Sequence, residues 1–208
     1  DMVQNHLLQV LSLVAMEEPK GTESSRIHES QYNLLSALKP IEDVRDSLVM
    51  GQYEGYLQEE NIPADSKTET YAALKLYVDN ERWQGVPFFI RTGKKMDSRE
   101  TQVVVQFKAV GDVHGNVLII RIQPDEGVYF QFNAKKPGTE QELQQISLDF
   151  CQSCILENRI NTPEAYERLL DACIKGDRSL FSQWDQIVAS WTFINKLIAK
   201  YEEQGSPL

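Results

Sequence analysis

The chain has 208 residues, of which 41% are hydrophobic and 25% are charged, and its formal net charge is −10 at pH 7. This composition is typical of a soluble globular protein and excludes a disordered chain, which has too few apolar side chains to form a core. No apolar run in the sequence approaches the roughly 20 residues that span a bilayer. The acidic balance argues against binding to nucleic acid or anionic membranes. We expect one large soluble domain over residues 1–208.

Three cysteines, Cys151, Cys154 and Cys173, are too few to form a complete set of pairs. Cys151 and Cys154 have the C-x-x-C spacing of redox motifs and of half a zinc site. No second pair and no nearby histidine accompanies them, and the motif follows a strand-like segment instead of opening a helix. We therefore favour incidental cysteines over a redox or zinc role, and we expect no metal site.

Helical periodicity dominates both ends of the chain. Residues 2–16 are predicted to form a first helix that is buried on most sides, and residues 24–40 form a second one, which Pro40 ends. Toward the other end, residues 162–176 have a Thr-Pro-Glu start and a glycine stop, and residues 184–201 carry a further apolar stripe. The apolar stripe of the first helix consists of Val3, His6, Leu7, Val10 and Val14.

Between these helices, residues 44–150 contain strand-like runs bounded by Gly, Asn or Asp. No helical crossover of about a dozen residues separates the runs, so the sheet should be largely antiparallel. The fold class that follows is α+β, with a large, mostly antiparallel sheet and helices packed on one face. The expected strands include residues 70–78, 87–91, 101–108, 117–122 and 128–132.

His6 is one of three histidines and lies within the apolar stripe of the first predicted helix. One interpretation is a core imidazole whose hydrogen bonds are satisfied internally. The other is a general base, because an imidazole with a pKa of about 6.5 accepts a proton at neutral pH when a carboxylate fixes its tautomer. Asp1 is close in sequence, but its spacing from His6 is not ideal for that contact.

Two strand ends offer polar side chains to a ligand. Residues 88–99 combine a hydrophobic strand, a glycine turn and four basic residues, which in an acidic chain indicates either an anion site or a solvated turn. The pattern of a P-loop is absent from this turn. The second strand ends at Gln123 and leads into Pro-Asp-Glu-Gly, where the amide could meet a ligand or precede an ordinary β-turn.

Five ordered segments together resemble the C-terminal domain of glucose-6-phosphate dehydrogenases. The resemblance covers nearly the whole chain, and it implies that family's α+β fold. It also implies the family's reaction in the cytoplasm, the oxidation of D-glucose 6-phosphate to 6-phospho-D-glucono-1,5-lactone in the oxidative pentose phosphate pathway. The segments are D-M-V-Q-N-H-L-L-Q at 1–9, E-R-W-Q-G-V-P-F-F-I-R-T-G-K at 81–94, I-R-I-Q-P-D-E-G-V at 120–128, K-K-P-G at 135–138 and P-E-A-Y-E-R-L-L at 163–170.

The resemblance implies roles for five residues. His6 matches the family's base, which removes the proton of the C1 hydroxyl while hydride passes from C1 to the nicotinamide of NADP or NAD. Asp1, Lys94 and Gln123 match positions that contact the substrate. Arg99 stands where family members often carry a basic residue near the substrate.

Family members also have an N-terminal Rossmann domain, whereas no G-x-G-x-x-G follows a strand in this sequence. We therefore expect the chain to be the C-terminal piece of a larger enzyme, with NADP bound mainly by a domain absent here, and to be inactive by itself. The alternative is a non-catalytic binding or oligomerisation module derived from the family. Association through the large sheet, as in the family, implies a homodimer or homotetramer.

Animal relatives hold an additional structural NADP with basic side chains. The matching positions here are Glu100, Val104 and Gln131, which are acidic or neutral. A phosphate would therefore find no cationic partner at these positions. We expect no structural NADP site in this chain.

Overall fold

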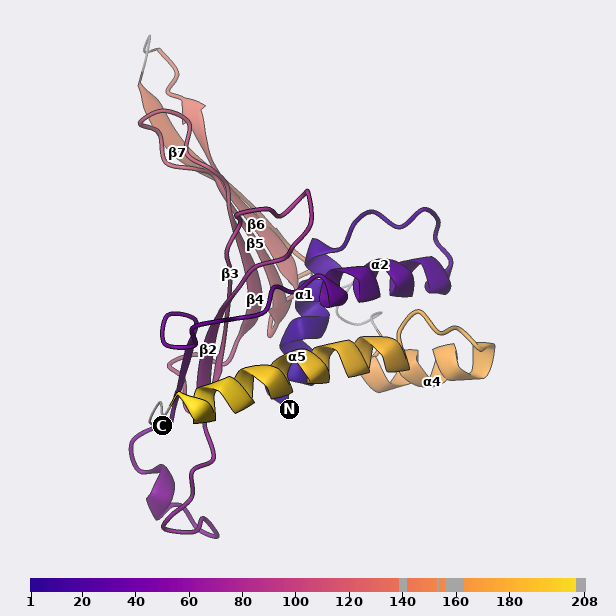
Figure 1. Cartoon of the computed structure of the whole chain (residues 1–208). Coiled ribbons are helices and arrows are strands. Elements are labelled where there is room, and N and C mark those ends of the chain that lie inside the picture. The colour runs from indigo at the N-terminus through magenta and orange to yellow at the C-terminus, as the bar shows by residue number, and fades with distance from the viewer. Residues whose placement is uncertain (139–141, 153, 156–162, 205–208) are drawn as a thin grey trace. The chain divides into compact units, whose positions relative to one another are not determined.

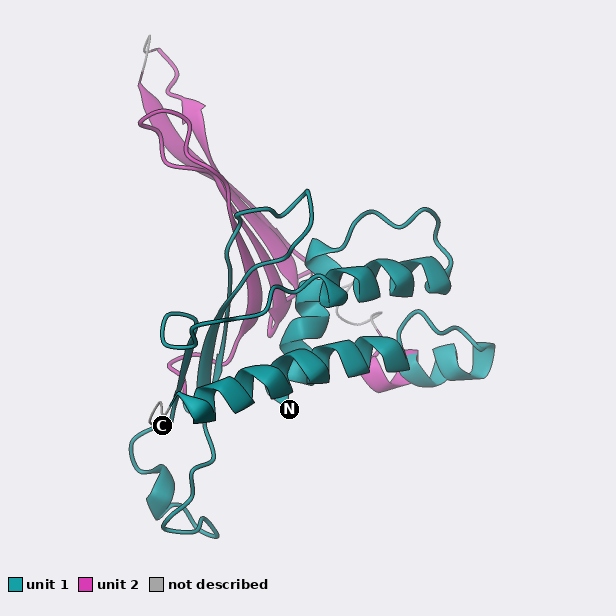
Figure 2. Cartoon of the chain, in the orientation of Figure 1, with its two compact units in different colours: residues 1–95, 169–208 teal, residues 96–168 magenta. Residues whose placement is uncertain are grey.

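The computed structural model describes residues 1–138, 142–152, 154–155 and 163–204 (Figure 1). The chain divides into two compact units, which are coloured separately in Figure 2. Unit 1 consists of residues 1–95 and 169–208, and unit 2 consists of residues 96–168. Helices and antiparallel strands are both present, so the predicted α+β class is confirmed.

The predicted helices are confirmed as η1 with α1, α2, α4 and α5. A π-helical turn, η1, opens the chain and continues directly into α1. Gly176 ends α4 in the left-handed conformation, with φ of 70°, whereas the predicted N-cap at residue 162 lies outside the described residues. None of the helices in the described ranges is long and apolar enough to cross a membrane. The bounds are η1 Met2–Leu7, α1 Leu8–Ala15, α2 Ser24–Ser36, α4 Ala165–Lys175 and α5 Trp184–Glu203.

Unit 1 contains a three-stranded antiparallel sheet of order β1-β2-β3. The 52–70 connection between its first two strands includes one 3-10 turn, η2. Leu74 in the middle strand is opposite Leu48 on one side and Ile90 on the other, so three apolar side chains share one face. The bounds are β1 Leu48–Gly51, η2 Tyr56–Gln58, β2 Tyr71–Leu76 and β3 Phe88–Gly93.

The core of unit 1 lies between this sheet and helices α1, α2 and α5. Leu8, Val44 and Leu76 are completely buried at its centre. The first helix turns a different face inward from the predicted one, because polar Gln4 and Ser12 are buried while Val14 is 40% exposed. It is therefore less enclosed than its apolar composition predicted.

Unit 2 is built on a four-stranded antiparallel sheet of order β4-β5-β6-β7, seen in Figure 1 as a twisted ribbon. The predicted antiparallel pairing is confirmed, although the strands of the described residues are bonded as two sheets and not as one. No residue in the described part of unit 2 is fully buried. The bounds are β4 Thr101–Gln106, β5 Val117–Gln123, β6 Gly127–Lys135 and β7 Leu143–Cys151.

One face of the unit 2 sheet is apolar across all four strands. Paired residues of antiparallel strands share a face, so the register places two complete apolar rows on the same side. We call this the apolar face. Its rows are Val103, Ile120, Val128 and Phe150, and Val105, Leu118, Phe130 and Leu148.

Candidate active site

His6 lies on the π-helical turn at the start of the chain, and its side chain is exposed. This contradicts the interpretation of His6 as a core imidazole. The widened turn follows from the hydrogen bond between the N–H of Leu8 and the carbonyl of Val3, which spans five residues instead of four. The buried face of the turn is occupied by Gln4, which leaves His6 accessible to a ligand.

Asp1 contacts Asn5 and does not form the carboxylate partner of His6. The amide of Asn5 donates from Nδ2 to Asp1 Oδ1 at 2.5 Å, and the backbone N–H of Asn5 donates to the Asp1 carbonyl at 2.9 Å. The amide oxygen of Asn5 accepts a hydrogen bond of 3.0 Å from Trp191 Nε1 on α5. The first turn is therefore fixed to the last helix, a contact that sequence spacing could not reveal.

Lys94 directly follows β3 and is exposed. Its backbone N–H donates to the carbonyl of Thr70 at 2.8 Å, which closes the end of the β2–β3 ladder. Strand β3 also packs against η1, the turn that carries His6. Unit 1 thus contains His6 on η1, Asp1 directly before η1 and Lys94 directly after β3, and η1 and β3 touch.

Arg99 and Gln123 belong to unit 2, where both line a hollow of about 300 Å³. The predicted turn after Gln123 is confirmed as the hairpin connection between β5 and β6, and the Gln123–Pro124 peptide bond is cis. Seven of the eight lining residues carry hydrogen-bonding side chains. It is lined by Ser98, Arg99, Glu100, Gln102, Arg121, Gln123, Pro124 and Asp125.

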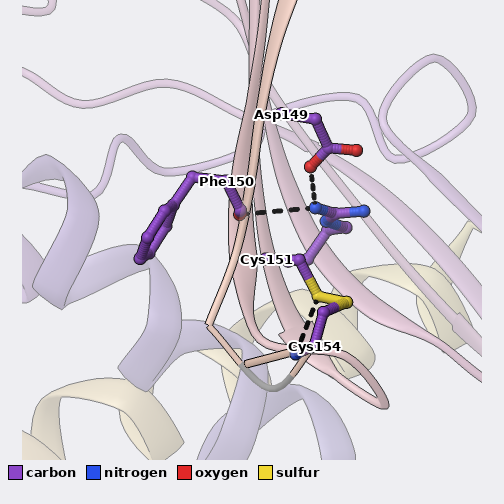
Figure 3. The surroundings of a disulfide bond; sticks show 5 residues. Asp149, Phe150, Cys151 and Cys154 are labelled. Carbon is purple, nitrogen blue, oxygen red and sulfur yellow. Dashed lines mark hydrogen bonds and ion pairs between the residues drawn. A yellow bond between two sulfur atoms is a disulfide. The ribbon is translucent and has the colours of Figure 1, made fainter. Parts of the chain in front are cut away.

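Arg121 also lines this hollow, although the sequence did not single it out. Its Nη2 forms an ion pair with Asp149 on β7 and donates to the carbonyl of Phe150 at 3.4 Å (Figure 3). The Nε of Arg121 is buried and has no hydrogen-bond partner among the described residues. The only sequence feature that could have indicated a role for Arg121 is its position as a lone charged residue in an I-R-I-Q strand. Its carboxylate partner, Asp149, is 28 positions away in the sequence.

The two cysteines of the C-x-x-C motif, Cys151 and Cys154, are joined in a disulfide (Figure 3). This differs from the expectation of incidental cysteines. The Cα atoms lie 5.3 Å apart, which is within the range that a disulfide bridges. Cys173 is free and exposed. The described residues contain no group of three or more His, Cys, Asp or Glu that could hold a metal ion.

Of the positions that matched a structural NADP site, Glu100 lines the hollow of unit 2. The carboxylate of Glu100 accepts a hydrogen bond of 3.0 Å from Ser98 Oγ at the edge of the hollow. This carboxylate opposes the attraction of a phosphate to the hollow, which Arg99 and Arg121 also line. The absence of a structural NADP site in this chain stays a prediction.

Comparison with known proteins identifies relatives along the whole chain. A family model described as "Glucose-6-phosphate dehydrogenase, C-terminal domain" matches residues 1–207. The glucose-6-phosphate 1-dehydrogenase of Bacillus subtilis is 42% identical over 99% of this chain and 48% of its own length. That of Dictyostelium discoideum is 41% identical over 98% of this chain and 44% of its own length. The chain therefore spans about half the length of the curated relatives it matches.

Solved structures show the same similarity. One is described as "Glucose-6-phosphate dehydrogenase in complex with its substrate glucose-6-phosphate"; it superposes with a TM-score of 0.85 at 37% identity, covering 96% of this chain and 43% of its own. Glucose-6-phosphate 1-dehydrogenase from Mycobacterium avium gives 0.78 at 34% identity, covering 95% and 43%. The chain belongs to the glucose-6-phosphate dehydrogenase family and matches the C-terminal domain of its members.

Proposed function

We propose that this chain is the C-terminal, substrate-binding and oligomerisation part of a glucose-6-phosphate dehydrogenase. The reaction is the NADP-dependent oxidation of D-glucose 6-phosphate to 6-phospho-D-glucono-1,5-lactone, in the oxidative pentose phosphate pathway of the cytoplasm. The observation that carries the proposal is the exposed His6 on its widened turn, within a chain that matches the family over residues 1–207.

His6 acts as the general base in this proposal. Its neutral imidazole accepts the proton of the C1 hydroxyl, the C1–hydrogen bond breaks with both electrons, and a C1 carbonyl forms as the lactone. The nicotinamide coenzyme supplies the hydride acceptor when it is bound. An exposed imidazole can carry out this step because a proton acceptor must come within hydrogen-bond reach of the hydroxyl.

Four further residues contact the substrate in this proposal. Lys94 and Arg99 carry cationic groups that attract an anionic phosphosugar. Asp1 and Gln123 offer a carboxylate and an amide, which can hydrogen-bond to sugar hydroxyls. All four side chains are exposed. Asp1 and Lys94 belong to unit 1, and Arg99 and Gln123 belong to unit 2.

The experiment that tests the reaction uses His6→Gln in the full-length protein that contains this chain. Loss of the base should lower kcat for NADP reduction by about 10²–10⁴-fold, with little change in the KM for glucose 6-phosphate. His114→Gln is the matched control, since His114 is also exposed and lies in unit 2. An unsubstituted protein without glucose-6-phosphate-dependent turnover would contradict the proposal and favour a non-catalytic module.

The proposed oligomer is a homodimer or homotetramer formed through the sheet of unit 2. On the apolar face, Leu148 is 63% exposed, Phe150 is 54% exposed and Val128 is 39% exposed. Contiguous apolar side chains of this kind mark association surfaces. A second copy of the chain would cover these apolar side chains, because the family resemblance implies association through the large sheet.

A further inference from the structure

The turn after β3 is held in an unusual conformation. Lys95, which directly follows Lys94, has φ of 50°, in the left-handed region that residues other than glycine rarely adopt. Such a conformation persists only where surrounding contacts enforce it. Two side chains provide these contacts: the Lys95 ammonium forms an ion pair with Glu59 and lies 4.6 Å from the ring centre of Tyr53.

Glu59 and Tyr53 come from the 52–70 connection and are joined to each other. Tyr53 Oη donates to Glu59 Oε1 at 3.3 Å. The backbone N–H of Tyr53 donates to Thr70 Oγ1 at 2.9 Å, and the carbonyl of Thr70 accepts the N–H of Lys94 at 2.8 Å. The connection therefore contacts the turn at both the Lys94 backbone and the Lys95 side chain.

Both members of the ion pair remain charged at neutral pH. The hydrogen bond from Lys95 lowers the pKa of the Glu59 carboxyl, and the same contact raises the pKa of the Lys95 ammonium. The two groups therefore attract each other under assay conditions, and salt screens this attraction because both side chains are exposed.

We propose that Glu59 and Tyr53 are positioning residues for Lys94, which act through Lys95 and fix the turn that presents the Lys94 ammonium to the anionic phosphosugar. This inference rests on the proposed function, which gives Lys94 a substrate contact. A fixed turn lowers the entropy lost when Lys94 meets its ligand. The effect is on substrate binding, because the cluster does not include His6.

The test is Glu59→Gln in the full-length enzyme, a change that keeps the side chain's size and removes its charge. The KM for glucose 6-phosphate should rise about 3- to 10-fold, while kcat and the KM for NADP remain within about twofold. The difference in this KM between Glu59→Gln and the unsubstituted enzyme should shrink at high salt, because salt screens the Glu59–Lys95 ion pair. Glu60→Gln, an exposed neighbour with the same change in charge, should leave the KM unchanged.

A double-mutant cycle with Lys95→Met shows whether Glu59 acts through Lys95. The double variant Glu59→Gln/Lys95→Met should bind substrate no more weakly than Lys95→Met alone. An undiminished effect of Glu59→Gln in the Lys95→Met background, or an unchanged KM in Glu59→Gln, overturns this inference alone. Absence of turnover in the unsubstituted enzyme overturns the proposed function as well. Melting temperatures of all variants exclude global unfolding as the cause of a raised KM.

Discussion

At the scale of single residues, Gly127 in the motif after Gln123 is explained by the close approach of the β7 backbone. Gly127 begins β6 opposite Cys151, and a Cβ atom added to it would lie 2.2 Å from the carbonyl oxygen of Phe150 and 3.0 Å from Arg121 Nη2. The first contact is with backbone, which cannot rotate away. The glycine therefore lets β6 and β7 pair next to the Arg121–Asp149 ion pair.

Gly127→Ala should destabilise the protein by about 1–3 kcal/mol, because the two strands must separate to admit the methyl group. Chemical denaturation of the variant and the unsubstituted protein measures the difference. Gly51→Ala is the control, since a Cβ at Gly51 would meet no atom within 4 Å. Equal stability of Gly127→Ala and Gly51→Ala would contradict the packing argument.

Asp43 provides a pH-dependent prediction at the same scale. Hydrogen bonds from the Arg45 side chain and backbone lower the pKa of its carboxyl from 3.8 to about 2. Because the folded pKa is depressed, the pair's contribution to stability is present above about pH 4 and disappears as the pH falls through about 2. A carboxyl titration followed by NMR should give that midpoint, and Arg45→Met should return it toward 3.8. A midpoint unaffected by Arg45→Met would be contrary to this account.

The sequence motifs predict candidate site residues, but they could not predict the environments of those residues. The hydrophobic neighbours of His6 at helical spacing predict that it lies on an apolar stripe, yet the buried position of that turn belongs to Gln4. Burial of polar residues in this helix depends on partners from distant segments. One example is Gln31 on α2, whose side-chain amide donates a hydrogen bond to Ser12 on α1. Local periodicity carries no information about such partners. For the same reason, the ion pair of Arg121 with Asp149 was not foreseen.

At the scale of secondary-structure elements, a buried polar network joins three helices of unit 1. Gln186 on α5 is 1% exposed, and its Nε2 donates to the carbonyl of His28 at 3.2 Å and to Gln31 Oε1 at 3.1 Å. Gln31 donates in turn to Ser12 Oγ on α1 at 3.3 Å. Gln186 also accepts the backbone N–H of Gln183 at 2.9 Å, which caps the start of α5. One side chain thus sets the position of α5 against α2.

Gln186→Ala should lower the free energy of unfolding by about 2–4 kcal/mol, because it leaves buried polar groups without partners and creates a cavity. Thermal or urea denaturation measures the loss. Asn195→Ala, an exposed change on the same helix, should stay within about 0.5 kcal/mol of the unsubstituted protein. If both variants lose the same stability, the helix itself is responsible and the network is not.

Elements were more predictable than contacts. The four helical segments and the strands at 70–78, 87–91, 101–108, 117–122 and 128–132 all correspond to observed elements, because periodicity and Gly or Pro boundaries act locally. Strand β1, at Leu48–Gly51, was not among the predicted strands. Its four residues are too few to show alternation, and it becomes a strand by pairing with β2. The division into two sheets likewise depends on pairing, which has no local signal.

At the scale of the whole molecule, the two units differ in how they are stabilised. Unit 1 buries a continuous core between helices and sheet, whereas the described part of unit 2 contains no fully buried side chain. A sheet of four strands normally needs a second layer to bury one face. The apolar face of unit 2 has the composition of such a buried surface, which supports its proposed role in association.

Leu148→Lys should therefore weaken self-association, since it places a charge on the apolar face. A charge placed among apolar interface side chains costs about 2 kcal/mol or more, which corresponds to about a 30-fold higher dissociation constant. Ser147→Lys adds the same charge at the neighbouring exposed position, which points to the opposite face of the sheet. Sedimentation equilibrium over a range of concentrations should show dissociation in Leu148→Lys and a retained oligomer in Ser147→Lys. An unsubstituted chain that remains monomeric at high concentration, or equal dissociation of both variants, would show that association does not use this face.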